Sequence, residues 1–125
     1  MNFRFARHTN DLEIIKHFYT CVLGFDLSGS FENHDGYNGI FIGKPDSDWH
    51  LEFTQSNEIV TFKFNEDDLL VFYPDEINEY NSLINNIEKH NINFIEAKNS
   101  YWNKNGKMFL DPDGYGIIVS NLKCK

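Results

Sequence analysis

The feature that most constrains the fold is a strand–helix–three-strand pattern that occurs twice along the 125 residues. In the first half, Phe3 and Phe5 lie two residues apart, as residues on one face of a strand do. A helical apolar stripe runs from Leu12 to Val22 and ends at Gly24, which suits the left-handed turn after a helix. Thr9, Asn10 or Asp11 is available to cap this helix. Three strands are then expected at about 26–32, 39–43 and 49–55.

The second half repeats this plan. The apolar run from Leu69 to Tyr73 predicts a buried strand, and Pro74-Asp75-Glu76 is typical of a helix start. The helix is expected to end at Asn91. Further strands are expected at about 92–96, 106–110 and 116–120. Asp111-Pro112-Asp113-Gly114 lies between the last two of them and predicts a hairpin turn, because Pro and Gly suit those turn positions.

The segment 56–68 joins the two halves and permits two interpretations. Val60, Phe62 and Phe64 alternate with polar residues, which favours an extra strand or an arm that covers a site or packs on a second subunit. A surface loop is the alternative, although three exposed apolar side chains would be unusual there.

Composition excludes several classes of function. The 41% of hydrophobic residues can build one core, whereas the formal net charge of -8 would repel nucleic acid and anionic membranes. Cys21 and Cys124 make no disulfide framework, which favours a reducing cytoplasm. The first residues contain no apolar signal region, and no apolar run is long enough to span a membrane.

Three motifs in this order carry a family resemblance: His17-Phe18-Tyr19-Thr20-Cys21-Val22-Leu23-Gly24-Phe25, Trp49-His50-Leu51-Glu52-Phe53-Thr54 and Phe109-Leu110-Asp111-Pro112-Asp113-Gly114-Tyr115-Gly116. The chain resembles the glyoxalase, bleomycin-resistance and extradiol-dioxygenase proteins, which form the vicinal oxygen chelate superfamily. The resemblance implies an α+β fold, with two βαβββ modules forming a cup-shaped, partly open β-barrel and helices outside. It implies one domain over 1–125, with module one at about 1–57 and the linker and module two at about 58–125. Because two-module relatives commonly pair, a homodimer is expected.

Metal-dependent members of this superfamily hold a divalent cation at four strand positions. The resemblance places those positions at Arg4, Glu52, Leu69 and Ile118. Of these, only Glu52 offers a ligand, and Arg4 is a permanent cation that would repel a metal. We therefore expect no metal and no other cofactor. The alternative is an improvised metal site of His34, His50 and Glu52, because His50 and Glu52 share a strand face.

The ligand site is expected on the inner face of the cup. Alternation directs His50, Glu52 and Thr54 toward the cup, and Trp49, Leu51 and Phe53 toward the helix. We predict an ion pair between Arg4 and Glu52, which either fills the vacated metal site or grips a polar group of a ligand. The candidate binding residues in the second module are Tyr73, Tyr101, Trp102 and Met108. Their aromatic rings permit two interpretations: they stack on a planar ligand, or Trp102 is buried and simply anchors its loop.

Two functions follow from this site. The first is a metal-free protein that binds a small, partly aromatic ligand in an aromatic-lined cup. The second is a lyase or dioxygenase-type enzyme, either metal-dependent or using Glu52 as general base. Arg4 beside Glu52 would favour the charged carboxylate, which is a weaker base, and this counts against the second function.

Overall fold

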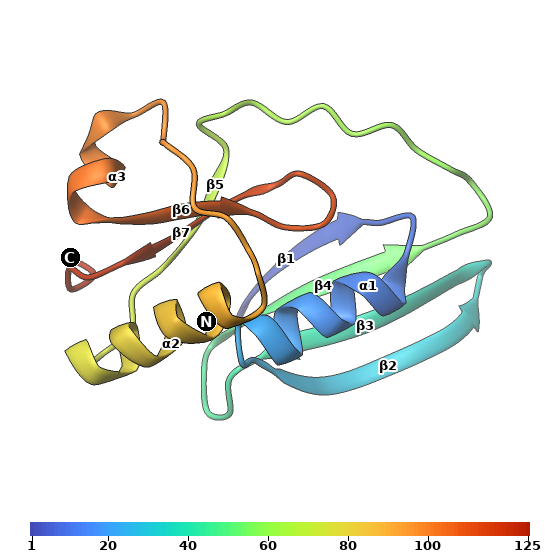
Figure 1. The fold of residues 1–125 in the computed structure, drawn as a ribbon. Helices are drawn as coiled ribbons and strands as arrows, with labels where there is room; N and C mark the ends of the chain where they lie inside the picture. The colour runs from blue at the N-terminus through green and yellow to red at the C-terminus, as the bar shows by residue number, and fades with distance from the viewer. The chain divides into compact units, whose positions relative to one another are not determined.

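The computed structural model describes all 125 residues, which divide into two compact units, Met1–Thr61 and Phe62–Lys125. The first unit contains one four-stranded sheet with the order β1-β4-β3-β2 (Figure 1). β1 pairs parallel with β4, and the other neighbours pair antiparallel. Its elements are β1 (Phe3–His8), α1 (Leu12–His17), the π-helical turn η1 (Phe18–Val22), β2 (Asp26–His34), β3 (Tyr37–Gly43) and β4 (Trp49–Gln55).

Local side chains define the ends of the first helix. Of the three candidate caps, Asp11 is the one used, because its carboxylate accepts the backbone N–H of Ile14 at 3.2 Å. The chain leaves η1 through Gly24, whose φ of +73° is the left-handed conformation expected there. The predicted helix is therefore present, but its last turn is π-helical.

The predicted alternation of β4 is confirmed, and it gives the first sheet two different faces. Leu51 and Phe53 are buried with Ile40 and Ile42 of β3 on the face covered by α1 and η1. The ring of Tyr19 in η1 lies 4.8 Å from that of Phe53. This core holds the sheet in place and leaves the opposite face available for other chemistry.

The second unit repeats the strand pairing of the first. Its sheet has the order β5-β7-β6, in which β5 and β7 pair parallel and β6 and β7 antiparallel, like β1, β4 and β3. The predicted mixed α+β class is confirmed. The elements of the second unit are β5 (Leu69–Phe72), α2 (Ile77–Lys89), α3 (Ser100–Asn105), β6 (Gly106–Leu110) and β7 (Gly116–Ser120).

The strand predicted at 92–96 is wrong. Only Ile95 pairs with Met108, as an isolated bridge, and the unpredicted α3 follows. The side-chain amide of Asn103 accepts from the backbone N–H of Ala97 at 2.7 Å and donates to its carbonyl at 3.0 Å. Asn99 caps α3 by accepting the N–H of Tyr101. These side-chain bonds satisfy backbone groups of Ala97 and Tyr101, so the chain turns into α3 soon after Ile95.

The linker forms no strand but is tied to each unit by specific contacts. The side chain of Asn10 donates to the carbonyl of Val60 at 2.8 Å and accepts its N–H at 3.0 Å. The rings of Phe62 and Phe64 stack at 5.4 Å, and Phe64 also meets Tyr115. The alternation of apolar residues in the linker thus reflects side-chain packing and a backbone clamp.

The hairpin turn predicted at Asp111 is confirmed. The N–H of Gly114 donates to the carbonyl of Asp111 at 2.9 Å, and Gly114 has a φ of +88°. The Asp111 carboxylate accepts the N–H groups of Asp113 and Tyr115, so this motif stabilises the turn between β6 and β7. None of the helices has the length and apolarity to cross a membrane.

Candidate functional site

The face of the first sheet opposite α1 is the candidate site, and we call it the aromatic face. Strand pairing sets its rows: Arg4 lies beside His50, Glu52 beside Phe41, and Thr54 beside Gly39. Phe31 of β2 is paired with Gly39, which places its ring on the same face. The members of the aromatic face are Arg4, His8, Phe31, Phe41, His50, Glu52 and Thr54.

One end of the aromatic face is organised by Arg4. Its Nη1 lies 3.5 Å from Oε1 of Glu52, so the predicted ion pair is present. Its Nε donates to Nε2 of His50 at 2.7 Å, and its guanidinium carbon lies 4.7 Å from the ring centroid of Phe41. His50 therefore accepts through Nε2 and carries its proton on Nδ1. The Arg4 side chain is half exposed while that of Glu52 is largely buried, so the pair also presents a charged surface.

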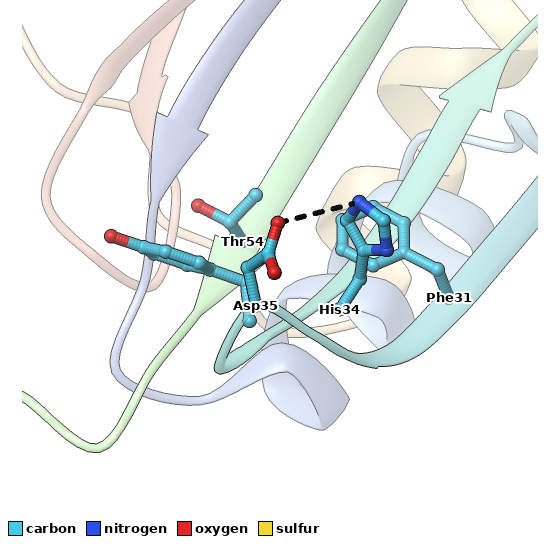
Figure 2. Close-up of a pocket in the computed structure, with 5 residues that line it drawn as sticks. Phe31, His34, Asp35 and Thr54 are labelled. Atoms are coloured by element: carbon cyan, nitrogen blue, oxygen red, sulfur yellow. Dashed lines mark ion pairs between the residues drawn. The ribbon is translucent and has the colours of Figure 1, made fainter.

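The other end of the aromatic face opens into a cavity of about 350 Å³ at the hairpin between β2 and β3. Figure 2 shows its residues, with Thr54 on β4 and with His34 next to Phe31. The Phe31 ring also lies 5.8 Å from that of Phe41, so it connects the cavity to the Arg4 end. The lining residues are Phe31, His34, Asp35, Tyr37 and Thr54.

Charge in the cavity is confined to its rim. Nε2 of His34 lies 3.8 Å from Oδ2 of Asp35, and both side chains are highly exposed. Asp35 has a φ of +52° and precedes Gly36 in the turn. The inner wall is made of hydroxyl and ring groups, which favours a neutral, partly aromatic ligand over an ion.

His8 is a functional candidate that sequence reasoning missed. It is the last residue of β1 and pairs with Thr54, whereas the sequence pattern indicated this strand only at Phe3 and Phe5. Its Nδ1 lies 3.3 Å from Oγ1 of Thr54, and its ring meets Tyr37 edge to face. The signal was its position four residues after Arg4, which on a strand places both side chains on the same face.

The superfamily positions in the second unit hold apolar side chains. Leu69 and Ile118 pack with Met108 and Ala97 in one hydrophobic cluster, on which Trp102 of α3 also lies. No three His, Cys, Asp or Glu side chains anywhere in the chain gather as metal ligands would. With Glu52 paired to Arg4, these residues do not fit a resident divalent cation.

The predicted binding residues of the second unit divide into buried and exposed ones. Met108 is 6% exposed, and Trp102 is partly buried against it. This packing agrees with the interpretation that Trp102 anchors its loop. Tyr101 is exposed and meets Trp102 edge to face. Partial burial raises the pKa of Tyr73 above its ordinary value, and Cys124 and Tyr101 raise it further, so Tyr73 stays a neutral phenol at neutral pH.

Comparison with known proteins adds to this geometry. Residues 3–54 match the family model described as the YycE-like N-terminal domain, and residues 67–121 match the YycE-like C-terminal domain. The chain is 36% identical over 121 residues to the uncharacterized protein YycE of Bacillus subtilis, covering 96% of this chain and 87% of the relative. A crystal structure of a YycE protein of unknown function from Bacillus subtilis superimposes with a TM-score of 0.87 at 34% identity, over 99% of this chain and 91% of that one.

More distant structures share the fold. Glyoxalase I of Leishmania major has a TM-score of 0.73 at 22% identity, with 94% of this chain and 84% of that chain covered. TnmS3, an antibiotic binding protein from Streptomyces sp. CB03234, has a TM-score of 0.68 at 22% identity, with 96% and 93% covered. At these identities the likeness concerns the fold alone.

Proposed function

The chain belongs to the YycE-like family of the vicinal oxygen chelate superfamily, and on that premise we propose that it is a metal-free small-molecule-binding protein. The ligand is a small, partly aromatic molecule held on the aromatic face of the first unit. The observation that carries this proposal is the continuous row of rings from Phe41 through Phe31 to the cavity of about 350 Å³. A cavity of this volume lies at the lower end of the range that small-molecule sites occupy.

The packing of the second unit supports a site confined to the first unit. On the face where superfamily members carry ligands, Leu69 and Ile118 are packed under Trp102 and Ala97. A ligand there would have to displace a hydrophobic cluster, and this would cost the burial energy of those side chains. The aromatic face needs no such displacement, because Arg4 and Tyr37 are already exposed.

The alternative function, an enzyme with Glu52 as general base, is less well supported. Oε1 of Glu52 already lies 3.5 Å from Nη1 of Arg4, so this oxygen is engaged and is not free to take a proton from a substrate. A metal-dependent lyase or dioxygenase would need ligands that Leu69 and Ile118 do not supply. TnmS3, which shares this fold, is described as an antibiotic binding protein, and this supports our proposal of a binding role here.

The metal-free state is directly testable by elemental analysis. The untagged protein, dialysed against Mn, Fe, Co, Ni and Zn and then against buffer, should retain less than about 0.1 metal ion per chain, because one ligand from four positions does not make a stable site. One tightly held metal per chain would contradict the proposal. In that case His34→Ala and His50→Ala variants would show whether the two histidines were recruited.

Ligand binding can be tested with 2-naphthol, a flat aromatic probe followed by its fluorescence. We expect 2-naphthol to shift the NMR signals of β3 and β4 residues on the aromatic face. Arg4→Met should weaken its binding about threefold, because Arg4 lies over the ring of Phe41, which packs on Phe31 in the wall of the cavity. Lys16→Met removes a charge that is paired with Glu13 on α1, outside the aromatic face, and is the matched control. Unchanged affinity in Arg4→Met would assign the ion pair a purely structural role.

A further inference from the structure

A half-satisfied imidazole lies at the cavity end of the aromatic face. Nδ1 of His8 lies 3.3 Å from Oγ1 of Thr54, but its Nε2 is buried and has no hydrogen-bond partner. A neutral imidazole has one N–H donor and one acceptor nitrogen, so either tautomer leaves one polar function of His8 unused. Burying a polar group without a partner is unfavourable, and such a group in a native structure calls for a physical reason.

The residues around His8 connect it to the cavity. Thr54 and Tyr37 both line the cavity, and the Tyr37 ring meets the His8 ring edge to face at 6.4 Å. Tyr37 begins β3 directly after the hairpin turn, and it is 46% exposed. A side chain with that much exposure can change rotamer without breaking the core. Rotation of Tyr37 would uncover His8 from the cavity side.

Arg4 is too far from the cavity to bind the polar group of a ligand that fills it. Arg4 and His8 are four residues apart on β1, which corresponds to about 13 Å along a strand. A molecule the size of two fused rings that fills the cavity therefore lies against Thr54 and the Phe31 ring, and it reaches His8 once the Tyr37 ring has moved. Its polar group has to match the chemistry of an imidazole and a hydroxyl.

We propose that His8 is the polar anchor of the cavity and that the ligand is a neutral aromatic molecule carrying a hydroxyl group. This assignment rests on the proposed binding function. The ligand displaces the Tyr37 ring, forms a hydrogen bond with Nε2 of His8, and packs its ring on Phe31. A hydroxyl both donates and accepts, so it satisfies either tautomer of His8. An anionic group would meet the Asp35 carboxylate at the rim and the net charge of -8 of the chain.

A matched pair of probes tests the anchor. 2-Naphthol and 2-methylnaphthalene have nearly the same shape, but only 2-naphthol can form hydrogen bonds. The wild-type protein should bind 2-naphthol about tenfold more tightly, because the methyl compound leaves the imidazole nitrogen unsatisfied. His8→Phe preserves a ring next to Tyr37 and should bind the two probes with equal affinity. Thr54→Val removes the hydroxyl that orients His8 and should also reduce the preference for 2-naphthol over 2-methylnaphthalene.

A spectroscopic readout keeps the test independent of how well the variants fold. In the wild-type protein, the ¹⁵N shift of His8 Nε2 should change on addition of 2-naphthol and not on addition of 2-methylnaphthalene. Equal wild-type affinity for both probes, or a preference that survives in His8→Phe, would refute the anchor and leave the aromatic binding site standing. Failure of both probes to bind would refute the proposed function and the anchor together.

Discussion

Replacing Ile118 with glutamate is expected to destabilise the protein by about 3–5 kcal/mol and to create no metal site. Ile118 is fully buried and packs with Met108, Ala97 and Trp102, so an introduced carboxylate has no partner. Urea unfolding followed by circular dichroism measures the loss, and elemental analysis measures metal content. Ile118→Val is the matched control and should cost only about 0.5–1.5 kcal/mol.

The pH dependence of the same variant checks the cause. Burial disfavours the charged form of a carboxyl, so the folded-state pKa of the introduced group lies above its unfolded value of about 4.3. The unfolded state then loses its proton more readily as pH rises, and the destabilisation relative to wild type grows from pH 5 to pH 8. Wild-type stability, or one metal ion bound per chain, would show that this position is open to solvent or to a metal.

Replacing Gly39 with alanine is expected to weaken binding of 2-naphthol by at least about tenfold and to lower the free energy of unfolding by about 1–3 kcal/mol. A Cβ atom at Gly39 would lie 2.3 Å from two carbon atoms of the Phe31 ring. The ring has to leave its position, and it is a wall of the cavity as well as its link to Phe41. Isothermal calorimetry with 2-naphthol measures the affinity.

Two further variants separate the clash at Gly39 from other effects. Gly29→Ala is the matched control on β2, because its Cβ would meet only Phe41, at 3.3 Å. In a Phe31→Ala background, Gly39→Ala should cost little extra stability, since the ring it displaces is absent. A stability loss that persists in that background would show that the strain lies in the backbone at Gly39 and not in the contact with Phe31.

The parts of the site that the sequence predicted depend on short-range periodicity and on the repeat. Because side chains alternate along a strand, His50 and Glu52 had to share a face that Leu51 and Phe53 do not. The ion pair of Arg4 with Glu52 followed from the resemblance, which placed both residues at metal positions of the superfamily. The turn at Asp111 followed from local turn chemistry alone.

The rest of the site depended on strand register and on competition for backbone hydrogen bonds. Phe31 reaches the aromatic face only through its pairing with Gly39. β2 has register shifts on both sides of this pair, and the alternation of residue types in the sequence does not predict such shifts. Of the expected strand at 92–96 only Ile95 pairs, with Met108, and the chain then turns into α3, where Asn103 bonds Ala97 and Asn99 caps the helix. His8 was missed because a strand end is uncertain by one or two residues.

The sequence by itself determined the α+β class, the strand–helix–three-strand order of the first unit, the face of each β4 residue and the absence of metal-ligating side chains at Leu69 and Ile118. These properties depend on residue types and on periods of a few positions, which the chain carries locally. Only the tertiary structure decided that Trp102 lies on the Leu69 and Ile118 cluster, that Phe31 and Thr54 line one cavity, and that His8 contacts Thr54 beside it. Such contacts join residues far apart in the chain, and their geometry is set by the packing of the whole unit.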